Sequence, residues 1–159
     1  MIVIGVDVGL KTTGFVVCKI AKDRVTLIKQ GEIITSAKDN LPKRLNLIFK
    51  KLAKTIKKYQ PQIIVLEKLY SHYRHPTTLG VLAQVRGVIV LLSSFYKLAL
   101  YEYLPTEVKK AIVGRGNAST GQVKRMIENV FLKKKIKSNH VADAFSLVVA
   151  FSHHYDQKN

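Results

Sequence analysis

Three carboxylates stand apart from the other acidic residues because each adjoins an apolar segment. Asp7 follows the run "IVIGV" and Glu67 follows "QIIVL", whereas Asp143 lies within "NHVADAFSLVVAF". An ionised carboxylate in such surroundings is unfavourable unless a cation meets it. Carboxylate oxygens with little sulfur favour Mg²⁺ or Mn²⁺, and a pair of such ions can activate water for phosphodiester hydrolysis. Asp7, Glu67 and Asp143 are therefore predicted to form a divalent-metal site with hydrolytic chemistry.

His140 is a fourth candidate, and two interpretations of it stay open. It lies three residues before Asp143, so both side chains would project from the same face of a helix. This favours a ligand role, but a single histidine is more often a helix-capping or core residue. The remaining acidic residues are expected in turns, on helix surfaces or in polar tails: Asp23, Glu32, Asp39, Glu102, Glu107, Glu128 and Asp156.

The net charge narrows the choice of partner. The 159 residues include 27 Lys and Arg but only 10 Asp and Glu, which gives a formal net charge of +17. Such a field favours polyanions and suits nucleic acid, with a generally basic protein as the alternative. Apolar residues make up 47% of the chain, which predicts a folded protein whose residues 1–159 form one domain.

The cysteine content and the apolar runs bear on location. Cys18 is the only cysteine, which excludes an intrachain disulfide and a cysteine-rich zinc site. The N-terminal residues do not resemble a secretion signal, and the longest apolar run, "GVIVLL", is too short to span a bilayer. We therefore expect a cytoplasmic protein with no membrane partner.

Hydrophobic patterning predicts strands and helices in mixed order. Strands are expected at residues 2–6, 15–20, 25–34, 62–67 and 99–103, the first three as an antiparallel meander. Helices are expected at residues 41–59, 78–96, 105–113, 119–131 and 139–155. This order predicts an α/β architecture with helices packed on a mixed sheet. Because functional groups gather at the carboxyl edge of open α/β sheets, Asp7 and Glu67 should lie side by side there.

Several segments, in order and spacing, resemble the RuvC family of Holliday-junction resolvases. They are "GVDVGLKTTG", "VLEKLY", "LAQVRGV", "YLPTEVKKAIVGRGNASTGQVKRMI" and "NHVADAFSLVVAF", and together they cover nearly the whole chain. The "EVKKAIVGRGNA" block and the terminal H-x-x-D-A are the most specific of them. The resemblance implies a ribonuclease-H-like fold, with a mixed five-stranded sheet and helices on both faces.

The resemblance also implies an activity and a set of partners. The family cuts two opposed strands of a four-way DNA junction as a homodimer, in recombination and repair. Its metal-binding positions correspond here to Asp7, Glu67, His140 and Asp143, with two Mg²⁺ or Mn²⁺ ions expected per site. The resemblance further implies a RuvA–RuvB-type branch-migration complex as a partner.

Candidate DNA contacts come from two basic segments. In "KLYSHYRHPTT", Tyr70, Tyr73 and Arg74 place aromatic rings beside cations, which suits stacking on an unpaired base. The resemblance makes Tyr70 a wedge at the crossover, although packing against the sheet edge or a partner subunit is an alternative. Further contacts are expected from Lys109, Arg115 and Lys124.

Two positions depart from the family pattern. Val8 stands where the family usually has proline, which should alter only the rigidity of the turn. Thr120 stands where many relatives have lysine, so Arg115 or Lys124 would have to supply that phosphate contact.

Other functions fit parts of the sequence. Actin-like ATPases and sugar kinases also open with a strand, an aspartate and a glycine-threonine turn, but they need two such domains around a cleft. A nuclease of RNA or of RNA–DNA hybrids would use the same fold and the same acidic residues. A catalytically dead binding module is disfavoured because all four site residues are present.

Overall fold

The computed structural model describes residues 1–159 except 23, 70–75, 133–134, 137 and 157–159. It contains one five-stranded sheet in the order β3-β2-β1-β4-β5. The strands are β1 (Ile2–Asp7), β2 (Thr12–Ala21), β3 (Arg24–Ile34), β4 (Ile63–Glu67) and β5 (Ala99–Tyr103). The first three strands pair antiparallel, whereas β4 runs parallel to both β1 and β5. The predicted meander and mixed sheet are confirmed.

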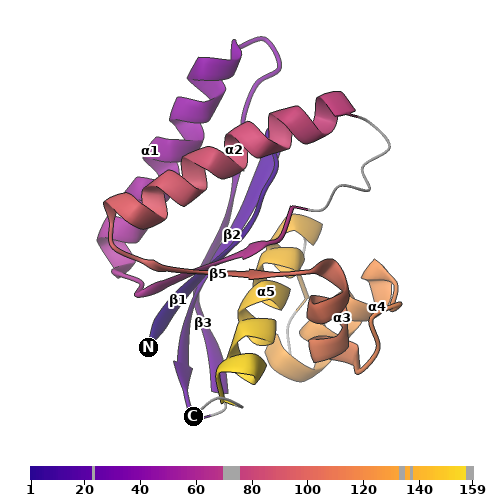
Figure 1. The fold of residues 1–159 in the computed structure, drawn as a ribbon. Helices are drawn as coiled ribbons and strands as arrows, with labels where there is room; N and C mark the ends of the chain where they lie inside the picture. The colour runs from indigo at the N-terminus through magenta and orange to yellow at the C-terminus, as the bar shows by residue number, and fades with distance from the viewer. Residues whose placement is uncertain (23, 70–75, 133–134, 137, 157–159) are drawn as a thin grey trace.

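Helices cover both faces of this sheet (Figure 1). One face carries α1 (Leu41–Tyr59) and α2 (Pro76–Phe95). The other carries α3 (Pro105–Val113), α4 (Thr120–Met126) and α5 (Asn139–Asp156). Two apolar cores result, one on each side, because alternate residues of the central strands point to opposite faces. Within the described residues we find no helix with the length and hydropathy needed to cross a bilayer.

The segment after α4 differs from the single α-helix that the sequence predicts. Residues Ile127–Leu132 form a π-helical turn, a local widening of the helix. Glu128, expected on a helix surface or in a turn, is only 8% exposed there, and its carboxylate accepts a 2.7 Å hydrogen bond from the Ile136 amide. The expectation for Glu128 was wrong because its hydrogen-bond partner lies beyond the helix and leaves no local signal.

Candidate active site

Asp7 and Glu67 lie at the carboxyl ends of adjacent parallel strands, β1 and β4. The pairing of these strands runs up to Val6 opposite Leu66, one residue before each carboxylate. Apolar runs build the two strands because both are buried on two faces, and the acids appear where the strands leave the core. Both side chains are partly exposed, as groups at a sheet edge should be. The predicted placement of these two residues is confirmed.

Helix α5 brings His140 and Asp143 to the same edge. The Ser138 hydroxyl accepts a 3.3 Å hydrogen bond from the Val141 amide and so caps the start of the helix. Gly14 on β2 lets the helix lie directly on the sheet, since a Cβ there would come within 2.4 Å of the His140 carbonyl oxygen. Gly5 on β1 allows a similar approach, because its Cβ would lie 2.3 Å from the Ala144 carbonyl oxygen.

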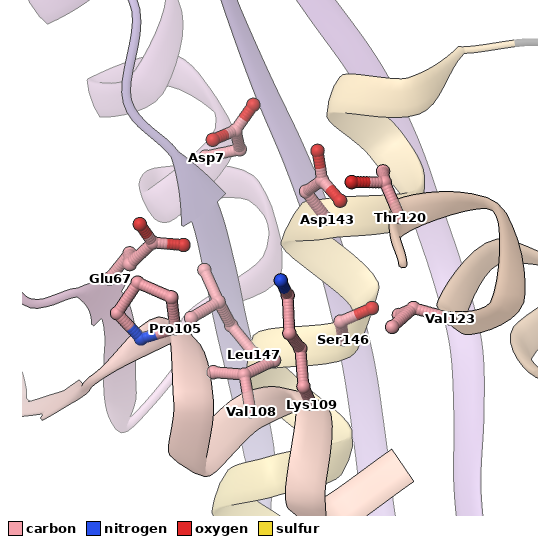
Figure 2. Close-up of a pocket in the computed structure, with 10 residues that line it drawn as sticks. All are labelled: Asp7, Glu67, Pro105, Val108, Lys109, Thr120, Val123, Asp143, Ser146 and Leu147. Atoms are coloured by element: carbon pink, nitrogen blue, oxygen red, sulfur yellow. The ribbon is translucent and has the colours of Figure 1, made fainter. Parts of the chain in front are cut away.

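The three carboxylates face one cavity of about 60 Å³, shown in Figure 2. Asp7 comes from β1, Glu67 from β4 and Asp143 from α5, and Lys109 extends toward them from α3. The remaining lining residues come from α3, α4 and α5: Pro105, Val108, Thr120, Val123, Ser146 and Leu147. The cavity therefore brings three carboxylates and one ammonium group together beside a largely apolar wall.

Burial and mutual repulsion make these carboxylates weaker acids than usual. Burial raises the pKa of Glu67 to about 7, with further increases from the negative charges of Asp7 and Asp143. Burial and the charge of Asp7 raise the pKa of Asp143 to about 6, although His140, Lys124 and Lys109 oppose this. A cation bound between these carboxylates would relieve their mutual repulsion.

His140 contacts Asp7 directly. Its Nδ1 lies 2.7 Å from Asp7 Oδ2, across two segments 133 residues apart in sequence. Burial raises the pKa of Asp7, and the hydrogen bond and charge of His140 partly offset that rise. The imidazole is 45% exposed and Asp7 24%, so this pair lies at the mouth of the site. A core role for His140 is therefore wrong.

The donor set suits a hard divalent cation, although it does not form a closed cage. Among the described residues, no group of three or more His, Cys, Asp or Glu side chains is arranged as a ready-made metal site. The side chains nevertheless supply the oxygen and imidazole donors that Mg²⁺ and Mn²⁺ accept. Their raised pKa values are what metal-free carboxylates around such a site should show. The residues therefore fit a divalent-metal site by their chemistry.

These shifts predict a pH-dependent stability for the metal-free protein. The pKa of the Glu67 carboxyl is about 4 in the unfolded chain and about 7 in the folded chain. Its ionisation therefore destabilises the fold as the pH rises from about 4 to above 7. Glu67→Gln should therefore raise the melting temperature in EDTA at pH 8 and change it little at pH 4. Thermal unfolding at both values checks this, and an equal effect at the two pH values would contradict it.

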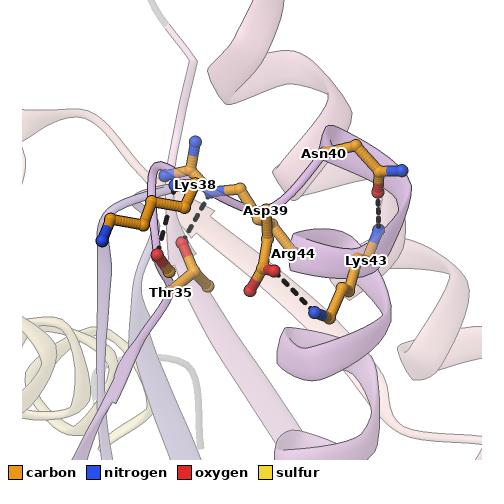
Figure 3. Close-up of polar contacts among 7 residues, drawn as sticks. Thr35, Lys38, Asp39, Asn40, Lys43 and Arg44 are labelled. Atoms are coloured by element: carbon orange, nitrogen blue, oxygen red, sulfur yellow. Dashed lines mark hydrogen bonds and ion pairs between the residues drawn. The ribbon is translucent and has the colours of Figure 1, made fainter.

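The loop after Asp7 is held by hydrogen bonds from neighbouring segments. The Thr13 hydroxyl donates to the Gly9 carbonyl at 2.6 Å, and the Thr35 hydroxyl donates to the Leu10 carbonyl at 2.6 Å. Arg44 Nε donates in turn to the Thr35 hydroxyl at 2.8 Å (Figure 3). These bonds connect the loop to β2, to the residue that follows β3 and, through Arg44, to α1, so they hold the chain beyond Asp7 in place.

The start of α1 is secured separately. The Asn40 side chain accepts a 3.1 Å hydrogen bond from the Lys43 amide, and the Lys43 ammonium lies 2.6 Å from Asp39 (Figure 3). Asn40 is a standard N-cap, whereas the exposed ion pair adds little stability. The helix that carries Arg44 therefore begins at a fixed position.

Three of the residues predicted to contact DNA lie at different distances from the cavity, and the other three are outside the described residues. Lys109 lines the cavity, and Lys124 on α4 donates a 3.0 Å hydrogen bond to the Asn139 side chain at the start of α5. Arg115 is exposed in the loop after α3, away from the cavity lining. The other three predicted contacts, Tyr70, Tyr73 and Arg74, lie outside the described residues.

Two residues near the site were not predicted from the sequence. Ser146 lines the cavity, although its hydroxyl already donates a 2.8 Å hydrogen bond to the Ala142 carbonyl. Arg86 on α2 reaches the main chain of Glu67, with Nη1 2.7 Å from the Glu67 carbonyl oxygen. One signal could have found Arg86, since it is the only charged residue in α2, whose other residues are neutral and mostly apolar.

Comparison with known proteins identifies the family. The family model for the crossover junction endodeoxyribonuclease RuvC matches residues 3–153. The chain belongs to the RuvC family. A RuvC from Alkaliphilus metalliredigens is 36% identical over 96% of this chain and 93% of its own length. A second, from Syntrophomonas wolfei, is 32% identical over 98% of this chain and 90% of its own length.

The fold agrees with solved RuvC structures. Thermus thermophilus RuvC in complex with a Holliday junction substrate superposes with a TM-score of 0.92 at 21% identity, over 99% of this chain and 96% of that one. The yeast mitochondrial Holliday junction resolvase Ydc2 superposes with a TM-score of 0.64 at 16% identity, over 98% of this chain and 83% of that one. The ribonuclease-H-like fold is confirmed, as is membership of a family of divalent-metal-dependent nucleases.

Proposed function

We propose that this RuvC-family chain resolves four-way DNA junctions by cutting two opposed strands, in recombination and repair. The observation that supports this most is the convergence of Asp7, Glu67 and Asp143 on one cavity in a family of crossover junction endodeoxyribonucleases. Residues 1–159 would act as a single nuclease domain. A cytoplasmic location stays a prediction from the composition, and assistance by a RuvA–RuvB-type branch-migration complex stays one from the family resemblance.

The catalytic role falls to the four residues at the sheet edge. Asp7, Glu67, Asp143 and His140 would hold two Mg²⁺ or Mn²⁺ ions. Such ions, when bound, supply an activated water and stabilise the leaving oxygen. Rigid strands hold Asp7 and Glu67, and α5 holds the other two, so the donors keep their relative positions during the reaction.

Basic residues around the cavity would hold the DNA backbone. The Lys109 charge acts on both Glu67 and Asp143, which supports a position beside the scissile phosphate. Lys124 and Arg115 would contact phosphates farther along the strand. Tyr70, with Tyr73 and Arg74, follows the end of β4 in sequence, and we keep Tyr70 as the proposed wedge at the crossover.

A homodimer would present two such sites to one junction. Leu91 and Phe95 on α2 are 61% and 69% exposed, whereas Val85, Ile89 and Leu92 on its inner side are fully buried. The helix therefore offers an apolar outer stripe in addition to its core face. Packing of this stripe on the same stripe of a second copy would form a two-fold dimer that matches the symmetry of a junction.

A substrate panel tests the proposed function. The chain should cleave a synthetic four-way junction in Mg²⁺ or Mn²⁺ and leave a linear DNA duplex of the same sequence largely intact. An RNA–DNA hybrid serves as the third substrate, because the same fold and acids would suit a nuclease of that class. Preferential cleavage of the hybrid would contradict the proposal.

A further inference from the structure

Arg86 connects three elements around the end of β4. From α2, its guanidinium donates through Nη1 to the Glu67 carbonyl oxygen at 2.7 Å and forms an ion pair through Nη2 with Glu102 on β5. Its side chain is only 14% exposed, and burial lowers the pKa of the guanidinium. Burying an unpaired charge costs several kcal/mol, so a largely buried guanidinium needs acceptors that hydrogen-bond and neutralise it.

The carbonyl that Arg86 binds belongs to the last residue of β4. Pairing of β4 with β1 stops at Leu66, one residue earlier. On the other side, the Lys68 amide donates to the Tyr103 carbonyl at 2.8 Å, which fixes the chain just after Glu67 to β5. Arg86 and this hydrogen bond therefore hold the peptide groups around Glu67 from two directions.

Two other roles fit the contacts less well. Arg86 contacts Glu67 at its main-chain carbonyl, and the carboxylate that it pairs with belongs to Glu102, so its position does not suit neutralising the Glu67 side chain. Arg86 is also poorly placed to bind a phosphate, because Nη1 and Nη2 already bind protein acceptors and little of the side chain is exposed. It does line a second cavity of about 60 Å³ that shares Asp7 and Glu67 with the first.

We propose that Arg86 is a positioning residue, which holds the main chain of Glu67 against Glu102 so that the Glu67 carboxylate faces the metal site. The proposal rests on the proposed function, because it takes Glu67 to be a metal ligand. Residues that orient metal ligands typically change metal affinity or activity about 10- to 100-fold when replaced. Lysine should substitute poorly, because a single ammonium lacks the planar fork that reaches both acceptors.

The test measures Mn²⁺ binding to the DNA-free protein, by electron paramagnetic resonance of free Mn²⁺, together with single-turnover junction cleavage against Mn²⁺ concentration. Arg86→Met should weaken Mn²⁺ binding about 10- to 100-fold and shift the cleavage curve to higher Mn²⁺ by a similar factor. Junction binding in EDTA, and its salt dependence, should not change. Lys19→Met, at the opposite end of the sheet, is the control for loss of one positive charge and should match wild type.

Glu102→Gln separates positioning from simple stability. The amide oxygen still accepts from Arg86, so this variant alone should keep nearly wild-type Mn²⁺ affinity. Combined with Arg86→Met, it removes the unpaired carboxylate and should recover melting temperature without recovering Mn²⁺ affinity. Recovery of both together would show that Arg86 acts only through stability and would overturn the proposal.

Two further outcomes distinguish failure of this inference from failure of the proposed site. In the first, Glu67→Gln binds Mn²⁺ more weakly, whereas Arg86→Met folds and binds Mn²⁺ normally. That result would overturn the role of Arg86 and leave the metal site intact. Normal Mn²⁺ binding in Glu67→Gln would overturn the assignment of Glu67 itself. Weaker junction binding by Arg86→Met in EDTA, with a salt slope reduced by about one, would instead make Arg86 a phosphate contact and overturn the proposal.

Discussion

Asp7→Asn should lower the single-turnover rate of junction cleavage about 10³-fold or more while leaving junction binding nearly unchanged. The amide keeps the size of the carboxylate and can still accept from His140, but it is a poor ligand for a hard cation. Loss of a metal's contribution to the transition state amounts to several kcal/mol, and each 1.36 kcal/mol changes the rate tenfold. Binding should persist because contacts from lysine and arginine to phosphates dominate affinity.

Asp39→Asn is the matched control for this variant. Asp39 lies before α1 in an exposed pair with Lys43, so the same chemical change there should alter neither cleavage nor binding. Rates come from quenched-flow or gel assays at saturating protein, and affinities from gel shifts in EDTA. Near wild-type cleavage by Asp7→Asn in Mg²⁺ would show that the site is assigned incorrectly.

Leu91→Asp combined with Phe95→Asp should convert the protein to a monomer at micromolar concentration and suppress paired incision of a junction. Central apolar anchors of an interface are typically worth about 2 kcal/mol or more each, and in a two-fold contact each residue occurs twice. The four substituted side chains of the dimer together correspond to about 8 kcal/mol, so the dimer constant should weaken about 10⁵-fold or more. Both side chains are exposed in the single chain, so the fold itself should be kept.

Val130→Asp supplies the control for adding an acid at an exposed apolar position. Val130 is 57% exposed on the π-helical turn, apart from α2. Sedimentation velocity should show a dimer for this variant and for wild type, and a monomer for the double variant. A wild-type protein that sediments as a monomer with and without DNA would contradict the dimer proposal.

The sequence predicted the sheet and the position of its acids for a physical reason. Parallel strands buried on two faces need continuous apolar runs, so Asp7 and Glu67 stand out at the points where the runs end. Asp143 stands out in the same way within α5. A local pattern therefore sufficed to predict which carboxylates gather at the edge, because each is an exception within its own segment.

Contacts between residues that are distant in the sequence were harder to predict. Arg86 is visible as a lone charge in α2, but its acceptors are a main-chain carbonyl on β4 and a side chain on β5. Glu128 is similar, since its partner is the backbone amide of Ile136 and its burial depends on a π-helical turn. The hydrophobic periodicity of the sequence does not indicate such partners, so only the folded structure reveals them.

Resolution of a cruciform plasmid tests the central claim most directly. Supercoiled plasmid with one extruded cruciform is mixed with excess protein, and cleavage starts on addition of Mg²⁺. Two opposed cuts at one junction release linear DNA, whereas a single cut relaxes the plasmid and removes the cruciform. We predict linear plasmid as the main product in Mg²⁺ and intact supercoiled plasmid in EDTA. Open circles as the main product, or equal cutting of a plasmid without the cruciform, would contradict symmetric junction resolution by this chain.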